Sequence, residues 1–373
     1  MGNPGRKTSK AAGSGEFWIE TPRALARHMP VDVAALDRVV ADYPMRVNQY
    51  FLQLALKAGS ALLRQVIPDP LELDLPEGLV DPLEEDKFSP VPNLTHRYPD
   101  RVLFLVSDQC GVYCRFCTRK RKIGRWASMD DDTIRKGLDY IREHSEIRDI
   151  LLSGGDPLLL VADRLEWILT EIRKIRHIEI VRIGTRVPSV MPWKITRRLV
   201  ELLRRFPPLY VNVHFNHPAE LTTMARAACG RLANAGIPLG NQTVLLKGVN
   251  DDLPVLQTLM RNLMKIRVKP YYLLQADWVR GTNHFRTSIE TGLQLMDGLW
   301  KTLPQMAVPA YVVDLPGGGG KVTLLPRQVI KVEQNDIVLR TAAGTIERIS
   351  ARPRKGKGGR PQPEAACVWS GVP

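Results

Sequence analysis

The sequence is poor in cysteine and lacks any long apolar run. Only five cysteines occur among 373 residues, too few for the disulfide framework of a small secreted protein. No apolar run approaches the ~18–20 residues that span a bilayer, and the first residues carry no signal-peptide core. These absences argue against membrane and secreted classes, so we expect a cytoplasmic protein with no membrane partner.

Acidic residues are outnumbered by basic ones, and the formal net charge is +14. Part of the excess lies in residues 351–373, and more lies beside the cysteines in residues 115–122. A site for small molecules with phosphate and carboxylate groups would explain the second group. The sequence has no basic strand interleaved with aromatic residues, so we expect no nucleic-acid partner. A non-catalytic RNA- or ribosome-associated protein that uses its basic tail is the alternative outside the enzymes.

Three of the five cysteines, Cys110, Cys114 and Cys117, form a C-x3-C-x2-C motif directly after an apolar run at residues 102–106. Three thiolates on one loop can ligate three irons of a cubane cluster and leave the fourth iron open. Zinc prefers four protein ligands, and neither a histidine nor a fourth cysteine lies within the loop. Incidental thiols in a reducing compartment are the alternative, but so close a grouping in a cysteine-poor chain favours a cluster.

The middle of the chain alternates short β-rich runs with helical stretches, and six such units occur in series. This order predicts parallel strands with helices outside them. The expected fold class is α/β, a partial (βα)6 TIM-like barrel with an N-terminal helical extension and a small C-terminal β-rich segment. We expect Asp32 to cap the first long helix, Pro44 to follow its end, and three short antiparallel strands to lie within residues 329–350. The expected regions are a disordered lead at 1–15, a helical N-terminal region and linker at 16–94, the barrel at 95–305, a lysine segment and β meander at 306–350, and a disordered basic tail at 351–373.

In a barrel of this class the chemistry lies at the C-terminal ends of the strands. Five residues fall at such ends: Ser153, Gly154, Gly155, Asp156 and His214. Gln242 lies early in its strand. Glycines at a strand end let the backbone approach a ligand closely, although a plain βα turn would also use them. A histidine satisfied within the core is the default interpretation of His214.

A run of four glycines, residues 317–320, precedes Lys321. It is not a Walker loop, because Val322 rather than a serine or threonine follows the lysine. An amine beside a mobile glycine hinge suits a Schiff-base lysine that leaves its aldehyde and later returns. A flexible turn with a solvated lysine is the alternative.

Two further groups of charged residues have open interpretations. Arg97, Tyr98 and Arg101 could cradle a phosphate, or the two arginines could be solvated. Asp277 and Asp314 each follow an apolar run. Together they could bind a cationic group, or they could cap helices or form surface ion pairs.

Taken together, these motifs resemble the lysine 2,3-aminomutase family within the radical S-adenosylmethionine (SAM) superfamily. The resemblance extends from about residue 44 to residue 326. Besides the cysteine loop, the matching segments are residues 94–101, 153–158, 214–218, 241–242, 284–287 and 314–321. By this resemblance Cys110, Cys114 and Cys117 would hold a [4Fe–4S] cluster, and Lys321 would bind pyridoxal 5′-phosphate (PLP).

The resemblance also implies what surrounds each ligand. SAM would lie against six residues: Ser153, Gly154, Gly155, Asp156, His214 and Gln242. The PLP phosphate would lie near three: Arg97, Tyr98 and Arg101. Arg119 would pair with the substrate carboxylate, while Asp277 and Asp314 would hold the distal ammonium of a cationic substrate. Glutamate 2,3-aminomutases do not keep this acid pair.

The implied activity is that of an isomerase that converts L-lysine to β-lysine by 1,2-amino migration. A reduced cluster, supplied with electrons by a flavodoxin- or ferredoxin-type donor, would cleave SAM. The resulting radical would take a β-hydrogen from the PLP-bound amino acid. Arginine or ornithine could also satisfy the two acids, and supply of β-lysine for modification of elongation factor P is a further alternative.

One departure from the family concerns zinc. Members with zinc carry a cysteine after the Gly-Val-Asn-Asp turn and a cysteine cluster near the C-terminus. Here Asp252 takes the first place, and only Cys367 lies in the tail. We therefore expect no structural zinc, and a homodimer rather than a zinc-stapled tetramer.

Overall fold

The computed structural model describes residues 17–74, 77–124, 129–324, 329–332, 336–340 and 346–350. Contacts divide the chain into two units, residues 1–325 and residues 326–373. The expected disordered lead at 1–15 and basic tail at 351–373 lie outside the described residues. Within the described part of the chain, no helix is long and apolar enough to cross a membrane.

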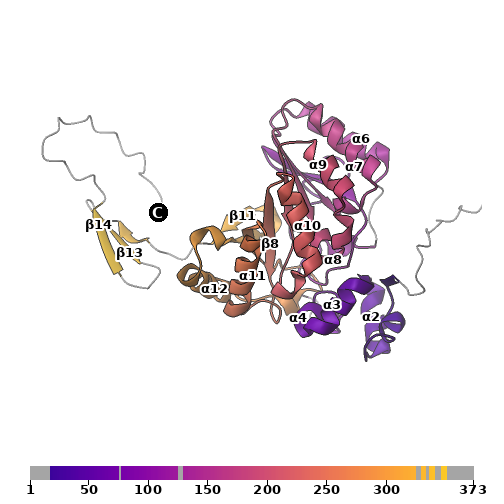
Figure 1. Cartoon of the computed structure of the whole chain (residues 1–373), viewed down its shortest axis with the longest axis horizontal. Coiled ribbons are helices and arrows are strands. Elements are labelled where there is room, and N and C mark those ends of the chain that lie inside the picture. Colours follow the sequence, from indigo (N-terminus) through magenta and orange to yellow (C-terminus); the bar gives the residue numbers. More distant parts are fainter. Residues whose placement is uncertain are drawn as a thin grey trace, which may run out of the picture. The chain divides into compact units, whose positions relative to one another are not determined.

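A curved nine-stranded sheet forms the frame of the first unit (Figure 1). The strands lie in chain order across it: β3 Leu94–Tyr98, β4 Arg101–Ser107, β5 Asp149–Gly154, β6 Ile180–Thr185, β7 Leu209–Val213, β8 Leu239–Leu245, β9 Lys269–Gln275, β10 Ala310–Leu315 and β11 Gly320–Thr323. Strands β4 to β10 are parallel, and the edge strands β3 and β11 are antiparallel to their neighbours. The carboxyl ends of seven strands therefore meet at one end of the sheet.

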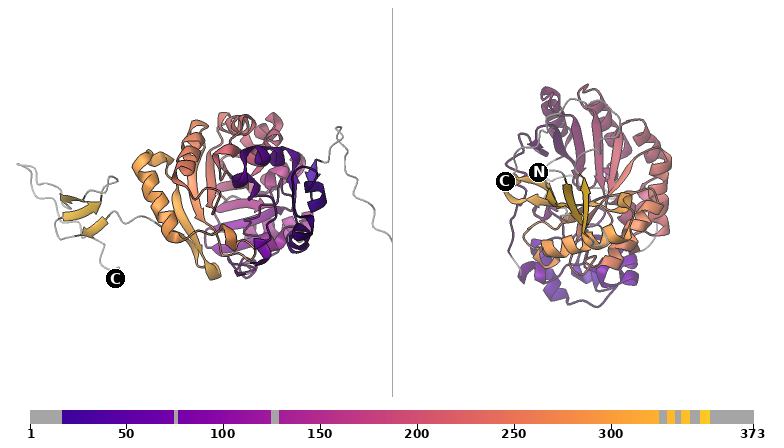
Figure 2. Two further views of the ribbon diagram at one scale, coloured as in Figure 1. Left: turned by 90° about the horizontal axis from the view of Figure 1, so that it is seen from below. Right: turned by 90° about the vertical axis from the view of Figure 1, so that its left-hand side faces the viewer.

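Helices connect the parallel strands and lie on the outer side of the sheet, as Figure 2 shows. In chain order they are α6 Asp131–Glu143, α7 Ala162–Arg173, α8 Val187–Val190, α9 Arg197–Arg204, α10 Thr223–Asn234, α11 Leu253–Lys265 and α12 Ile289–Thr302. The long helices turn an apolar stripe inward. In α6 the buried residues Ile134, Leu138 and Ile141 recur every three to four positions. The predicted α/β partial barrel is confirmed.

The sheet has three strands more than the six expected, because β3 adds a strand at one edge and residues 310–323 add two at the other. Strand β10 adds a seventh parallel strand beside β9, and β11 returns antiparallel beside β10. The backbone N–H of Lys321 on β11 donates to the hydroxyl of Tyr98, at the end of β3, over 2.8 Å. The two edges of the sheet meet at this hydrogen bond, so the partial barrel is nearly closed there.

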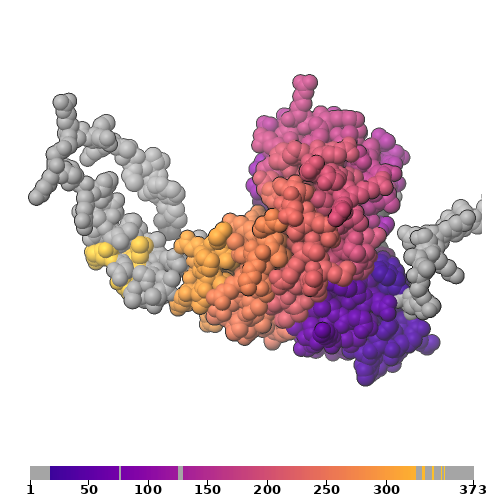
Figure 3. Space-filling view, in the orientation of Figure 1, coloured from indigo at the N-terminus to yellow at the C-terminus, as the bar shows by residue number. Residues whose placement is uncertain are grey.

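The N-terminal extension packs as a block against the barrel (Figure 3). It contains α1 Pro22–Leu25, α2 Val33–Asp42, α3 Gln49–Ala58, α4 Ser60–Leu63, α5 Leu71–Asp74 and a small sheet of β1 Trp18–Ile19 and β2 Val47–Asn48. The carboxylate of Asp32 accepts a hydrogen bond from the N–H of Ala35 at 3.0 Å, and Pro44 follows the end of α2. Both sequence predictions for this helix are confirmed.

The described residues of the second unit form a three-stranded antiparallel sheet, as their alternating pattern predicts. Strands β12 Val329–Val332, β13 Asp336–Arg340 and β14 Ile346–Ser350 pair in chain order. The connections at 333–335 and 341–345 lie outside the described residues.

Two helical glycines in the barrel provide a matched test of its packing. A Cβ on Gly137 in α6 would lie 2.5 Å from ring carbons of Phe104, whereas a Cβ on Gly230 in α10 would meet nothing within 4 Å. We predict that Gly137→Ala lowers the free energy of unfolding by about 1–3 kcal/mol through overpacking. Gly230→Ala should raise it by up to about 1 kcal/mol, because alanine favours the helix. Urea unfolding of both variants measures the difference, and equal effects would contradict this packing.

Candidate active site

The three cysteines of the loop after β4 face one cavity of about 270 Å³. Residues at or just beyond the ends of β4, β5, β6 and β7 line it, which places it at the carboxyl end of the sheet. The predicted site residues in its lining are Cys110, Cys114, Cys117, Arg119, Ser153, Gly154, Gly155, Asp156, His214 and Gln242. Every residue expected to hold the cluster or to contact SAM is therefore brought to one cavity.

The thiols of this loop suit a cluster better than a single ion. Among the described residues, no three His, Cys, Asp or Glu side chains are arranged to hold one metal ion. Three thiol donors on an open cavity match a cubane, which takes one thiolate at each of three irons and leaves one iron exchangeable. Burial, reinforced by the charge of Cys114, raises the pKa of Cys117 to about 11. Cluster assembly must therefore release protons from the free thiols.

Two glycines allow the end of β5 to approach the cysteine loop. The N–H of Gly155 donates to the carbonyl of Ser107, and the N–H of Asp156 donates to the carbonyl of Gln109, both over 2.6 Å. A Cβ on Gly155 would lie 2.2 Å from the Gln109 oxygen. Gly154 has a φ of +120°, and its Cβ would lie 2.4 Å from the Ser107 oxygen. The close approach that these glycines permit is made toward the loop that carries the cysteines.

The carboxylate of Asp156 is buried and binds protein donors. It accepts hydrogen bonds from the Thr185 hydroxyl at 2.8 Å and from the N–H groups of Arg186 at 2.7 Å and Val187 at 3.1 Å. Burial raises its pKa to about 6 in spite of these bonds. Asp156 therefore supports the turn after β6 and also lines the cavity.

His214, whose default interpretation was a core histidine, lines the cavity. Burial lowers its pKa to about 3, so the ring is neutral, and its Nε2 lies 3.1 Å from the amide oxygen of Asn216. The sequence pattern did not single out Asn212, which lines the same cavity with its amide nitrogen unpartnered. Its place two residues before His214 puts it on the same face of the strand. A buried donor without a partner fits a polar ligand.

Three of the basic residues beside the cysteines bind acids of the N-terminal region, so small-molecule anions are not needed to account for Arg115, Lys120 and Arg121. Arg115 and Lys120 both bind the buried carboxylate of Glu72 at 2.6 Å. Burial opposes ionisation of Glu72, but the two cations hold its pKa below the usual value. Burial also lowers the pKa of Lys120 to about 8. Arg121 pairs with Asp81 at 2.8 Å.

The N-terminal extension also holds the backbone of the cysteine loop. The amide of Asn48 donates to the carbonyl of Gly111 at 2.9 Å. The carbonyl of Gln65 accepts from the N–H of Arg115, also at 2.9 Å. Both Asn48 and Gln65 are fully buried. The shape of the loop therefore depends on a segment that precedes the barrel in sequence.

Lys321 lies in β11, directly opposite Asp314 of β10. Its ammonium forms an ion pair with the Asp314 carboxylate. The glycines before it make the turn between the two strands, and Gly317, Gly318 and Gly320 have φ values of +71°, +76° and +83°. Residues other than glycine rarely adopt such positive φ values. The lysine expected on a mobile hinge is thus held in a strand after a tight turn.

Asp277 follows β9 and lies between the cysteine loop and the pair of Lys321 and Asp314. It accepts a hydrogen bond at 2.9 Å from the hydroxyl of Thr118, the residue after Cys117. Burial, with the charge of Asp314, raises its pKa to about 6, while Lys321 acts in the opposite direction. The two acids predicted to bind one cation are therefore close enough to repel each other.

The three residues expected at the PLP phosphate differ in their contacts. Tyr98 accepts the backbone bond from Lys321, and the Arg101 guanidinium lies over the Tyr98 ring at 4.9 Å. Arg97 instead donates to the carbonyl of Leu83, and its buried Nε has no partner. A guanidinium with a free buried donor fits an anionic group such as a phosphate.

Residues 79–91, here called the strap, contact both the turn before Lys321 and Arg119 of the cysteine cavity. The ring of Phe88 packs against Gly318, where a Cβ would lie 2.3 Å from a ring carbon. Glu85 binds Arg119 through two hydrogen-bonded contacts of 3.0 and 2.7 Å. Glu85 is buried, so this two-point pair fixes the orientation of the Arg119 guanidinium. The sequence pattern gave no sign of Glu85, which lies 34 residues before its partner.

Comparison with known proteins gives consistent matches. A family model described as Radical SAM superfamily matches residues 104–258, and one described as Lysine-2,3-aminomutase matches residues 296–357. The L-lysine 2,3-aminomutase of Clostridium subterminale is 45% identical over 339 residues, covering 89% of this chain and 82% of the relative. That of Fusobacterium nucleatum is 47% identical over 316 residues, with 83% and 74% covered. The glutamate 2,3-aminomutase of Clostridioides difficile is 44% identical over 288 residues, with 77% and 68% covered.

Two glycines of the cavity test whether the β5 turn shapes the cysteine loop. Gly155→Ala would force the loop away, whereas a Cβ on Gly184, which lines the same cavity, comes no closer than 3.8 Å to any neighbour. After anaerobic reconstitution, we predict that Gly184→Ala retains about four irons per chain and that Gly155→Ala loses most of them. Iron and sulfide analysis measures this. Equal retention by the two variants would show that the loop does not depend on the turn.

Proposed function

The chain belongs to the lysine 2,3-aminomutase family of radical SAM enzymes, and on that basis we propose that it depends on PLP and converts L-lysine to β-lysine. As a family member it is an isomerase that uses a [4Fe–4S] cluster and SAM. The substrate and the PLP site are the proposed part. They rest on Lys321 and on the two acids beside it.

The acid pair carries the choice of substrate. Two neighbouring carboxylates repel each other unless a cation lies with them. Lys321 supplies such a cation to Asp314, while the pKa of Asp277 is raised to about 6. The distal ammonium of lysine would relieve the repulsion, whereas the carboxylate of a glutamate substrate would increase it. This observation favours a cationic side chain.

The residues where the sheet edges meet fit PLP. Lys321 offers the amine, and Tyr98, Arg97 and Arg101 offer a hydroxyl and two guanidinium groups to a phosphate. Bound there, PLP would supply a conjugated system that stabilises an unpaired electron while the amino group migrates. The Nζ of Lys321 forms an ion pair with Asp314, and a lysine acts as a nucleophile only as the free amine, so this pair must be released first.

Arg119 would orient the substrate between the cysteine cavity and the acid pair beside Lys321. It lies two residues after Cys117 and lines the cysteine cavity. A guanidinium that grips the substrate carboxylate would direct the β-carbon toward the cavity in which SAM binds. Fixing both ends of the substrate, at Arg119 and at the acid pair, removes most of its orientational freedom. The strap would limit access of water to this region.

The proposal is tested by anaerobic reconstitution with iron, sulfide and PLP, followed by reduction and addition of SAM. Lysine, arginine, ornithine and glutamate are then offered separately, and β-amino acid products are analysed. We expect β-lysine to form fastest and glutamate not to react. If none of the four is isomerised while both cofactors are bound, the proposed function is wrong. If glutamate reacts fastest, the role of the acid pair is wrong.

Asp277 should make lysine binding depend on pH. Because its pKa is raised to about 6, the carboxylate becomes protonated as the pH falls through that value, and a neutral acid holds an ammonium poorly. KM for lysine should therefore rise below pH 6, by up to about tenfold per pH unit. Asp277→Asn should raise KM in neutral buffer by about ten- to hundredfold and remove the pH dependence.

The matched control for Asp277 is Asp297→Asn. Asp297 lies on α12 and pairs with Lys301 at 2.7 Å on the surface, so its loss should change neither KM nor its pH profile. A wild-type KM that stays constant across the acid range would contradict the role of Asp277.

Loss of the Glu85 charge should raise KM by the same factor for all substrates. Glu85 orients Arg119, and Arg119 would bind the carboxylate that all of them share. Glu85→Gln keeps the shape but loses the charge that holds Arg119 at two points. We predict a rise in KM of about tenfold for lysine and for each slower substrate. Glu84→Gln, a change beside it in the strap where the partly exposed Glu84 pairs with Lys87, should have no effect. An effect confined to one substrate would refute this role.

A further inference from the structure

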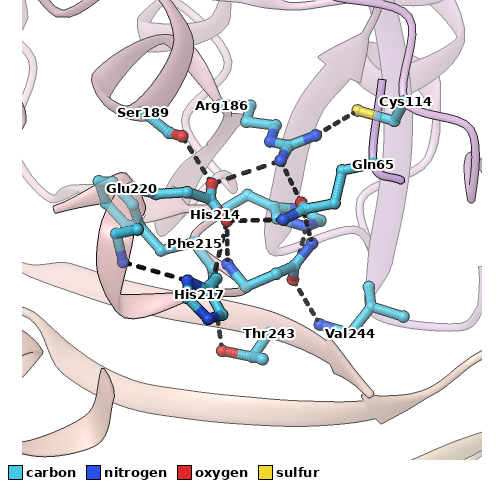
Figure 4. A network of polar contacts seen from close by, with 12 residues as sticks. Gln65, Cys114, Arg186, Ser189, His214, Phe215, His217, Glu220, Thr243 and Val244 are labelled. Carbon is cyan, nitrogen blue, oxygen red and sulfur yellow. Dashed lines mark hydrogen bonds and ion pairs between the residues drawn. The ribbon is translucent and has the colours of Figure 1, made fainter. Parts of the chain in front are cut away.

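Arg186 is a buried cation that touches one of the cysteines. Its Nη1 donates a hydrogen bond to the Sγ of Cys114 over 2.8 Å (Figure 4). Arg186 directly follows β6, and its side chain is only 9% exposed. It was not among the predicted site residues, since nothing in the sequence connects it with a cysteine 72 residues away.

The guanidinium of Arg186 is fixed from several sides. Its Nη2 lies 2.5 Å from the amide oxygen of Gln65 and 3.3 Å from a carboxylate oxygen of Glu220. The rings of Phe51 and Phe116 lie 5.4 and 5.3 Å from its central carbon. A guanidinium held by two acceptors and two rings has little freedom to turn away from the sulfur.

Glu220 is the anion of this network and is itself fully buried. It accepts hydrogen bonds from the Ser189 hydroxyl at 2.7 Å and from the N–H groups of Asn216 and His217, each at 3.0 Å. Figure 4 shows it on the side of Arg186 away from Cys114. The sulfur therefore has a positive charge in contact and the compensating negative charge one step further off.

From this arrangement we infer that Arg186 raises the reduction potential of the cluster and that Glu220 partly cancels the effect. Reduction adds one electron, from an external low-potential donor, to a cluster that three thiolates already make negative. A positive hydrogen-bond donor on a ligand sulfur stabilises the more negative, reduced form. Arg186 is a positioning residue that acts through Cys114. The inference rests on the proposed binding of the cluster by Cys110, Cys114 and Cys117.

Redox titration of the reconstituted cluster, followed by electron paramagnetic resonance without SAM or PLP, tests the inference. Arg186→Gln removes the charge on Cys114. At a fixed ambient potential, the ratio of reduced to oxidised cluster should fall about tenfold, which equals about 59 mV for one electron. Glu220→Gln removes the opposing charge at nearly constant shape, so the ratio should rise, by about threefold or more. Arg182→Gln, on β6 but paired with Asp149, should leave the ratio unchanged.

If the role is electrostatic, the reduction potential shifts in opposite directions in the two variants, because they remove charges of opposite sign. A loosened loop would shift the potential in the same direction in both. Unchanged potentials, or shifts in the same direction, overturn the inference.

Iron is measured in each variant. If Arg186→Gln holds no cluster, the sign of the Glu220→Gln shift decides; if neither holds one, the network is structural and the inference fails. A wild-type protein without a cluster would overturn the proposed function as well, whereas a wild-type cluster with unshifted variants overturns only this inference.

Discussion

The ion pair that Glu72 forms with Arg115 and Lys120 is the interaction on which the site depends. Two cations within the cysteine loop are buried, and burying a charge without a partner costs several kcal/mol. Glu72 supplies that partner from the N-terminal extension. The Lys120 ammonium also donates to the carbonyl of Gly281 beyond β9 at 2.9 Å. The loop is therefore held by chain segments from both sides of it in the sequence.

The two groups of site residues share one end of the barrel, and rigid elements set their separation. Lys321 lies in a strand whose edge meets β3 at Tyr98. Asp277 reaches the cysteine loop through Thr118, and Arg119 extends from that loop. Radical chemistry requires the reacting atoms to stay within van der Waals reach. A lysine fixed in a sheet serves that need better than one on a mobile hinge.

Local patterns in the sequence predict local features well. The cysteine spacing, the Asp32 cap and the C-terminal meander each depend on residues within a few positions of one another. Glu72, Glu85 and Arg186 could not be found in this way, because each acts on a residue 34 to 72 positions distant. The run of glycines before Lys321 predicts flexibility by composition alone. Its role as a turn follows only from the pairing of β10 with β11, which the composition does not specify.

If the cysteine cavity and Lys321 act on one molecule, hydrogen must pass between the substrate and SAM. The most direct measurement supplies the reconstituted enzyme with SAM and with lysine deuterated at C3, and then analyses the recovered SAM by mass spectrometry. Deuterium should appear at the 5′ position of SAM during turnover and should be absent with Lys321→Ala. Product formed without deuterium in SAM, or labelled SAM from Lys321→Ala, would contradict a shared substrate.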